Sequence, residues 1–136
     1  MVKSIVARRL TQDQRETLSK LLRPMLGGSL AIVSPISDSE ASDFADDFNS
    51  AIRTGASWNT MRILDQVGEQ KCGVYVGMLG NSSSAQITLL SGALDAIGVS
   101  HRIVALRSDE VATTINFLPQ RTLFLLVGYN PQQMTE

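Results

Sequence analysis

The stretch of this sequence that is best suited to hold a ligand is a turn rich in glycine and serine. It consists of Gly80, Asn81, Ser82, Ser83 and Ser84, which follow an apolar run and open a predicted helix. Backbone N–H groups at the start of a helix lack partners within it, and the helix dipole favours negative charge there. The turn lacks the lysine of a phosphate-binding loop and the glycine spacing of a dinucleotide-binding motif. It therefore predicts a weakly specified site for phosphate, another small anion or a nucleotide, with a simple helix cap as the alternative.

A cluster of three aspartates has the spacing of possible metal ligands. Asp43, Asp46 and Asp47 lie three and four residues apart, which places their carboxylates on one side of a helix. Hard oxygen ligands of this kind attract divalent cations. Because no ligand from another segment accompanies them, we interpret the cluster as a solvated helix face and predict no metal site.

Residues that could form a nucleophilic site are present, but not in a catalytic pattern. His101 is the single histidine, and Ser34, Ser37 and Ser82 lie near the ends of predicted strands. The Gly-x-Ser-x-Gly pattern of a nucleophile elbow does not occur. We therefore interpret His101 as a turn residue, name no catalytic residue and expect no cofactor. The single cysteine, Cys72, excludes an intrachain disulfide and a zinc motif and is expected in the core.

An apolar stripe on the first predicted helix could serve as an interface. Leu18, Leu21 and Leu22 share one face of the segment that Pro24 ends. The stripe either packs on the chain's own sheet, which gives a monomer, or binds a second copy or another protein. Trp58 is interpreted as an anchor at the edge of the core, with a docking residue on an exposed rim as the alternative.

Charge is unevenly distributed along the chain, although the net charge is only −1. Residues 1–24 hold six basic residues against two acidic ones, a local charge of +4, and residues 37–52 hold five acidic residues and no basic one, a local charge of −5. We favour two solvated helix faces; the alternative is that the segments attract each other, within one chain or between two. With 5% aromatic residues and no basic stripe, nucleic-acid binding is not expected.

Periodicity and capping motifs predict alternating helices and strands. Helices are expected at 11–24, 38–54, 82–97 and 109–118, and strands at 30–33, 58–66, 73–79, 101–106 and 122–127. Capping boxes are predicted at Thr11 with Gln14 and at Ser37 with Glu40. The helix at 38–54 carries a core-facing stripe of Ala41, Phe44, Ala45, Phe48, Ala51 and Ile52.

This order predicts an α/β fold with a mixed central sheet of about five strands and helices on its faces, in two similar halves at 29–66 and 73–106. The connection after residue 66 is too short for a parallel crossover, so 58–66 and 73–79 are expected to form an antiparallel hairpin, with 73–79 central in the sheet. The two following helices would then begin at opposite ends of the sheet. The fold would be Rossmann-like without a true dinucleotide-binding site.

Length and composition indicate one globular domain. The 136 residues are 43% hydrophobic and 18% charged. We expect an N-terminal helix within 1–24, a sheet core at 29–127 and a frayed tail at 128–136. The sequence shows neither a secretory signal nor an apolar run of about 18 residues, so a cytoplasmic protein is expected.

Several short motifs resemble a bacterial domain of unknown function. They are Arg9-Leu10-Thr11 followed by Gln14, Ser37-Asp38-Ser39-Glu40-Ala41, Gly55-Ala56-Ser57-Trp58 and the ending Val127-Gly128-Tyr129-Asn130-Pro131. The inserted Ser57 departs from the pattern of that family. The resemblance implies a domain that often follows transmembrane helices on the cytoplasmic side, and hence a soluble relative or the cytoplasmic part of a membrane protein. It offers no catalytic residue to carry over.

These observations rank three functions. The first is a non-enzymatic interaction or sensory module of a bacterial, membrane-associated protein, with a protein partner or self-association. The second is a domain that binds a small anion or nucleotide at Gly80–Ser84, and an enzyme comes third.

Overall fold

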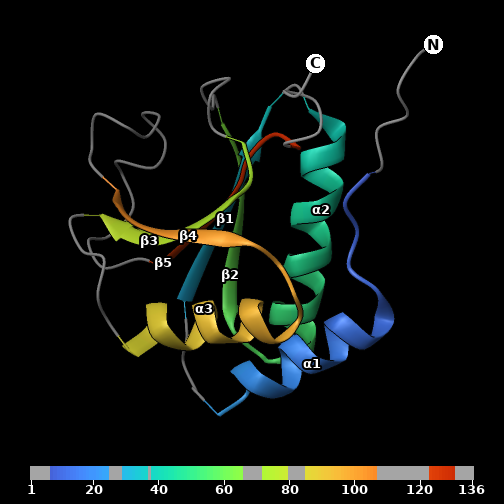
Figure 1. Ribbon diagram of the computed structural model, residues 1–136, viewed down its shortest axis with the longest axis vertical. Coiled ribbons are helices and arrows are strands. Elements are labelled where there is room, and N and C mark those ends of the chain that lie inside the picture. Colours follow the sequence, from blue (N-terminus) through green and yellow to red (C-terminus); the bar gives the residue numbers. More distant parts are fainter. Residues whose placement is uncertain are drawn as a thin grey trace.

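The computed structural model describes residues 7–24, 29–36, 38–65, 72–79, 85–106 and 123–130. These residues form the helices α1 (Gln12–Leu22), α2 (Ser39–Asn49) and α3 (Ala85–Ala96), and a π-helical turn, η1 (Ser50–Gly55), follows α2 directly. The strands are β1 (Ser29–Pro35), β2 (Asn59–Asp65), β3 (Val74–Leu79), β4 (His101–Leu106) and β5 (Leu123–Val127) (Figure 1). The predicted α/β fold with a mixed sheet of about five strands is confirmed.

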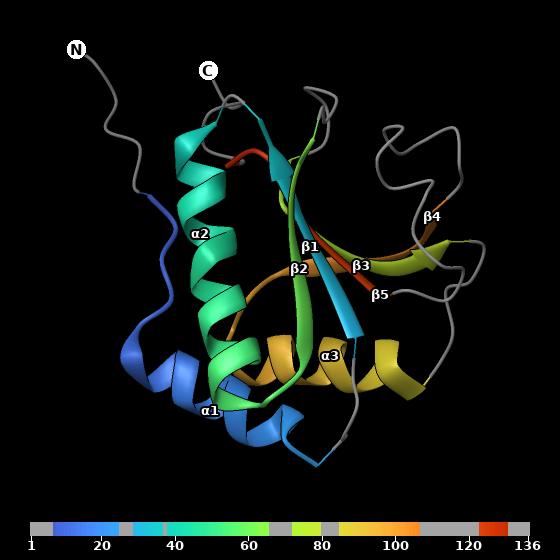
Figure 2. The same cartoon turned by 180° about the vertical axis from the view of Figure 1, so that it is seen from behind.

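The sheet consists of two parallel pairs joined by the last strand. Its order is β2-β1-β5-β3-β4. β1 runs parallel to β2 and β5, β3 runs parallel to β4, and β5 pairs with β3 in the antiparallel direction. The sheet twists strongly, so that β3 and β4 run across the views in which β2 is upright (Figure 1 and Figure 2). The predicted halves correspond to β1–α2–β2 and β3–α3–β4.

The predicted hairpin between residues 58–66 and 73–79 is wrong, and so is the central position of 73–79. β2 lies at one edge of the sheet, and β1 and β5 separate it from β3. The prediction assumed that a short connection joins neighbouring strands, which is the common case, but here β5 occupies the centre. The two strands do run in opposite directions, because β3 is antiparallel to β5. The helices after β1 and β3 therefore begin at opposite ends of the sheet, unlike those of a dinucleotide-binding fold.

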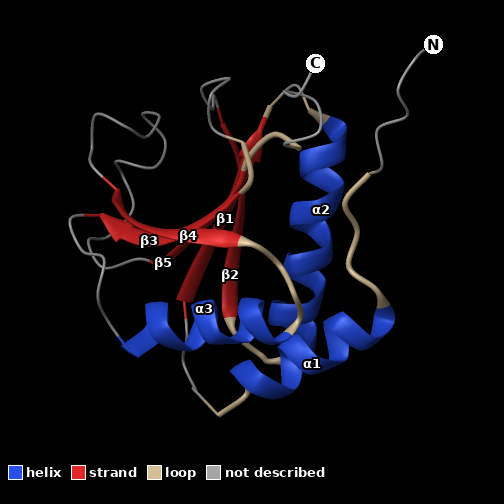
Figure 3. Cartoon of the chain, in the orientation of Figure 1, coloured by secondary structure: helices blue, strands red, loops and turns tan. Residues whose placement is uncertain are grey.

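One large core lies between the sheet and the helices, which gather on the same side of it (Figure 3). Phe44 and Phe48 from α2 contribute their rings, whose centroids are 4.9 Å apart. The complete stripe predicted for residues 38–54, which runs from α2 into η1, is buried: Ala41, Phe44, Ala45, Phe48, Ala51 and Ile52. Burial of each large apolar side chain contributes about 1.5–3 kcal/mol, so this stripe holds α2 against the sheet.

The opposite face of the sheet carries a second, smaller apolar cluster. Its buried members are Ala31, Val33, Ile63 and Phe124. No described helix contributes to this cluster, and the helix predicted at 109–118 lies outside the described residues. Among the helices that are described, none combines the length and the apolar composition needed to cross a membrane.

The starts of the first two helices show one predicted capping box and one different cap. Thr11 Oγ1 accepts a hydrogen bond from the N–H of Gln14 at 3.1 Å, and Gln14 Oε1 accepts one from the N–H of Thr11 at 2.8 Å, as predicted. The second predicted box is wrong, because α2 is capped by Asp38, whose Oδ1 accepts from the N–H of Glu40 at 3.1 Å. The side chain of Glu40 is thereby left for a partner elsewhere in the chain.

The beginning of the tail that was predicted to fray is packed into the fold. Gly73 and the residues after β5 exchange two backbone hydrogen bonds of 2.9 Å, from the N–H of Gly73 to the carbonyl of Tyr129 and from the N–H of Gly128 to the carbonyl of Gly73. Asn130 is only 2% exposed. The prediction is wrong for 128–130, and residues 131–136 lie outside the described part.

Candidate functional site

An extended segment before α1, residues 7–10, lies along α2 and is fastened to it at two points (Figure 1). At the first point the backbone N–H of Arg8 donates to Glu40 Oε2 at 2.7 Å. The Arg8 side chain donates to both oxygens of the same carboxylate, from Nε at 3.0 Å and from Nη2 at 2.7 Å. The two side chains are only 16% and 13% exposed. The two hydrogen bonds from the side chain fix both the position and the plane of the guanidinium.

The guanidinium of Arg8 makes two further contacts, and one of its nitrogens has no hydrogen-bond partner. Nη2 of Arg8 also donates to the carbonyl oxygen of Gly128 at 2.7 Å. The central carbon of the guanidinium lies 5.0 Å from the centroid of the Phe44 ring, within the range of a cation–π contact. Nη1 is buried and has no hydrogen-bond partner. A buried donor without a partner is uncommon and costs about 1–3 kcal/mol.

Asp47 provides the second point of attachment. It is 3% exposed and accepts hydrogen bonds from the backbone N–H of Leu10 at 3.0 Å, from Arg9 Nε at 2.8 Å and from Arg15 Nη2 at 2.7 Å. Burial by itself would raise the pKa of Asp47. The hydrogen bonds from Arg9 and from the N–H of Leu10, with the positive charges of both arginines, outweigh this effect and lower the pKa below its ordinary value.

The oppositely charged segments of the sequence therefore attract each other within one chain. The interpretation of the three aspartates as one solvated face is wrong for Asp47, whereas Asp43 and Asp46 are exposed. Asp46 accepts a hydrogen bond from Nε of Arg62 at 2.8 Å. Within the described residues, no group of three or more histidines, cysteines or acids is placed to hold a metal ion.

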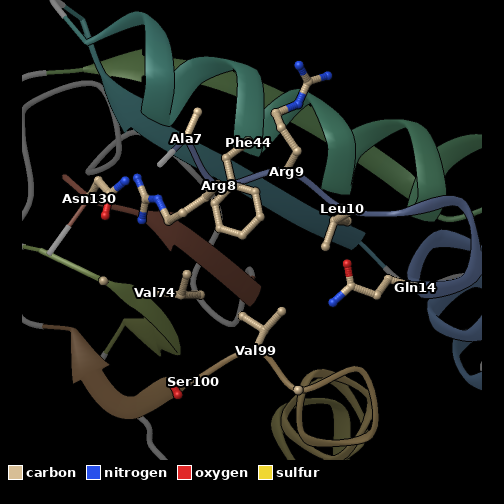
Figure 4. Close-up of a pocket in the computed structure, with 12 residues that line it drawn as sticks. Ala7, Arg8, Arg9, Leu10, Gln14, Phe44, Val74, Val99, Ser100 and Asn130 are labelled. Carbon is tan, nitrogen blue, oxygen red and sulfur yellow. The ribbon is translucent and has the colours of Figure 1, made fainter. Parts of the chain in front are cut away.

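Beside the attached segment lies a cleft of about 470 Å³, which we call the N-terminal cleft. It opens between residues 7–10, the start of β3 and the turn between α3 and β4 (Figure 4). The residues that line it are Ala7, Arg8, Arg9, Leu10, Gln14, Phe44, Gly73, Val74, Gly98, Val99, Ser100 and Asn130. Its volume lies within the range of small-molecule sites, about 300–1,000 Å³.

The inner surface of the N-terminal cleft is mainly apolar, with polar groups towards its ends. Leu10, Phe44 and Val74 are buried, and Val99 lies across the cleft from Phe44 (Figure 4). Arg8 reaches towards Asn130 at one end, and Gln14 lies at the other (Figure 4). Apolar walls with a few fixed polar groups are typical of sites that bind small organic molecules.

Two glycines shape the rim of the N-terminal cleft. Gly73 and Gly98 have φ angles of +89° and +77°, in the left-handed region that favours glycine. Gly98 ends α3 through a bond from its N–H to the carbonyl of Asp95 at 3.1 Å, and the N–H of Val99 bonds to the carbonyl of Leu94 at 2.9 Å. This pair of bonds is the Schellman motif, and it turns the chain so that Val99 reaches the cleft.

The interface residues predicted from the sequence lie mostly in the core. Leu18 and Leu22 are fully buried, and Trp58 is 2% exposed, with its Nε1 donating to the carbonyl of Leu22 at 2.9 Å. Leu18 and Leu22 thus pack on the chain's own domain, which is one of the two alternatives given for the stripe. Trp58 is buried too, so it does not lie on an exposed rim as a docking residue would. Leu21 is 37% exposed, and self-association stays a prediction. The ligand site predicted at Gly80–Ser84 lies outside the described residues.

His101, predicted as a turn residue, is the first residue of β4 and has a buried side chain. Its Nε2 lies 2.6 Å from Ser91 Oγ, and its Nδ1 lies 2.9 Å from the carbonyl oxygen of Val99. When Nδ1 carries the proton and donates to that carbonyl, Nε2 accepts from the serine hydroxyl. Neither side chain lines the N-terminal cleft, so the pair ties the turn after α3 to the helix and thereby supports the position of Val99.

Sequence reasoning names none of the cleft-lining residues as a site. The contact between residues 7–10 and α2 could have been predicted from the charge asymmetry, which is +4 in residues 1–24 and −5 in residues 37–52. This asymmetry could not have predicted the cleft, whose walls come from five separate parts of the chain. Comparison of the chain with known protein families, with curated proteins and with solved structures finds no match.

Proposed function

We propose that this protein is a non-enzymatic sensory module that binds a small organic molecule in the N-terminal cleft. The observation that carries the proposal is the cleft itself, about 470 Å³ in volume, with mainly apolar walls and an arginine anchored at one end. Most of its walls are fixed before any ligand arrives. Phe44 and Val74 belong to the core, and two ion pairs hold the segment that carries Arg8 and Leu10. A preformed site of this kind binds without a large ordering cost.

A sensory role is supported by how the cleft is built. One wall is the extended segment of residues 7–10, which is hydrogen-bonded to α2 through the carboxylates of Glu40 and Asp47. A ligand that contacts this wall changes the free energy of the attached state relative to the released state. Occupancy of the cleft can thus be transmitted to the N-terminal side of the chain.

The proposal is tested by recording amide NMR spectra during a screen of small organic fragments. A cleft-filling variant, Ser100→Phe, is compared with Thr17→Phe, because both residues are exposed and only Ser100 lines the N-terminal cleft. We expect bound fragments to shift the signals of residues 7–10 and 98–100 in the wild type and in Thr17→Phe. The same fragments should bind Ser100→Phe at least about tenfold more weakly.

Two results would contradict the proposal. The first is a screen in which no fragment shifts the signals of the cleft residues at millimolar concentration. The second is a response centred on residues 80–84, which would place binding at the predicted glycine and serine turn instead.

A further inference from the structure

We infer that the N-terminal cleft selects a small organic anion, with a carboxylate at the Arg8 and Asn130 end and an apolar body beside Phe44 and Val99. This inference rests on the proposed function and specifies its class of ligand. It draws on three properties of the site: the charge of the lining, the uncommitted nitrogen of Arg8 and the apolar surface next to it.

The lining of the N-terminal cleft carries positive charge without an acidic residue. Its two charged members are Arg8 and Arg9, and none of its twelve residues is an aspartate or glutamate. Their counter-charges, Glu40 and Asp47, lie outside the lining. The side chain of Arg9 points away from the cleft towards Asp47 (Figure 4), so the guanidinium of Arg8 is the cationic group nearest to a bound ligand. In a partly buried site its interaction with a ligand is screened less than at the surface. An anionic group is favoured over a neutral or cationic one.

The hydrogen bonds of Arg8 leave capacity for an acceptor. Glu40 takes Nε and Nη2 of the guanidinium, while Nη1 is buried and has no partner. A carboxylate accepts several hydrogen bonds and matches the planar fork of a guanidinium. An oxygen brought to this end of the cleft would compensate the unsatisfied donor after a small shift of the side chains around it.

The apolar part of the ligand is placed by the contact between Arg8 and Phe44. Since the guanidinium lies 5.0 Å from the centroid of the ring, a head group at Arg8 brings the adjoining atoms of a ligand to Phe44. Val99 lies on the other side of the cleft (Figure 4). An inorganic anion could use the charge of this site but would leave the apolar walls uncovered.

The inference is tested by titrating the intact chain with three probes: benzoate, its neutral analogue benzamide and inorganic phosphate. Amide NMR signals report where each probe binds, and the dissociation constants give the preference. We expect benzoate to shift the signals of residues 7–10 and 98–100 and to bind at least about tenfold more tightly than benzamide, because a charged hydrogen bond is stronger than a neutral one. Phosphate should bind more weakly than benzoate.

Two variants test whether Arg8 causes the preference. Glu40→Gln removes the internal counter-charge, so benzoate should bind about threefold or more tightly. In the double variant Arg8→Gln/Glu40→Gln, both partners become neutral amides, and the preference for benzoate over benzamide should disappear. Arg23→Gln serves as the matched control, because Arg23 is exposed and does not line the N-terminal cleft. Circular dichroism establishes that each variant is folded.

The outcomes separate this inference from the proposed function. Equal binding of benzamide and benzoate at the cleft residues would overturn the anion class while supporting a small-molecule site. Phosphate binding as tightly as benzoate would overturn the apolar body. A preference for benzoate that survives in the double variant would overturn the role of Arg8. If none of the probes shifts the signals of the cleft residues, the inference fails, and the fragment screen then decides the proposed function separately.

Discussion

Arg8 and Glu40 share three hydrogen bonds of 2.7 to 3.0 Å although they lie 32 positions apart in the sequence. One of these bonds comes from the backbone and two come from the side chain, so the carboxylate fixes both the course of the segment and the plane of the guanidinium. The segment of residues 7–10 is thereby attached to the first turn of α2.

Removal of this carboxylate should destabilise the fold. Glu40→Ala leaves a mostly buried guanidinium without its counter-charge, and we expect the free energy of unfolding to fall by about 3 kcal/mol. Urea denaturation measures the change. Asp43→Ala, on the exposed side of the same helix, should change the free energy by less than about 0.5 kcal/mol. Equal losses in the two variants would show that the ion pair contributes nothing specific.

Asp47 should make stability depend on acidic pH. Its folded-state pKa lies below the ordinary value of 3.8, so its contribution is fully present above the unfolded pKa and is lost as the pH falls through the folded value. At pH 7 we expect Asp47→Asn to lower the free energy of unfolding by about 2 kcal/mol. The difference in the free energy of unfolding between the wild type and Asp47→Asn should become smaller once the pH falls below about 4. Asp43→Asn, at an exposed position of the same helix, is the control. A difference for Asp47→Asn that does not change with pH would contradict a lowered pKa of Asp47.

Trp58 should stabilise α1 through its indole N–H. Trp58→Phe removes the donor that satisfies the carbonyl of Leu22 and leaves a small void in the core, and we expect a loss of about 2–3 kcal/mol. Far-ultraviolet circular dichroism during denaturation measures the change without relying on tryptophan fluorescence. A loss below about 0.5 kcal/mol would mean that neither the bond nor the packing of the indole matters.

Gly77 and Gly92 should respond in opposite directions to substitution by alanine. A Cβ at Gly77 would collide with the carbonyl oxygen of Val104, so Gly77→Ala must push β3 and β4 apart and should cost about 2 kcal/mol or more. A Cβ at Gly92 meets nothing within 4 Å, and in the middle of α3 it should stabilise the helix by about 0.5–1 kcal/mol. Thermal melts of both variants measure these changes in stability. If both substitutions stabilise the fold, or both destabilise it, the prediction is contradicted.

Local patterns in the sequence predicted local structure well. The capping box of Thr11 with Gln14, the buried stripe of α2 and the end of α3 at Gly98 all depend on residues a few positions apart, and the structure confirms them. Strand order was not predictable in the same way. The short connection between the predicted strands 58–66 and 73–79 suggested that they are neighbours in the sheet. The later strand β5 takes the central position instead, and no residue near this connection predicts that outcome.

The candidate site was the least accessible part of the fold to sequence reasoning. Asp47 has the same spacing as the exposed Asp43 and Asp46, and its burial follows from Arg9, Arg15 and the N–H of Leu10, all more than 30 positions away. Helical spacing tells which aspartates share a face but not what covers that face. Leu18 and Leu22 show the same limit, because a stripe that could bind a partner is covered by the chain itself.

The place of β5 in the sheet also determines when the fold can form during synthesis. A ribosome releases residues 29–65 and 74–106 well before residues 123–127, and each earlier stretch already contains a parallel pair of strands with its helix. Until β5 emerges, the two pairs present four unpaired strand edges, the kind of surface that promotes aggregation. Its insertion between β1 and β3 covers two of those edges in one step. A chain truncated just before residue 123 would retain nearly all of the described secondary structure and still lack a continuous sheet.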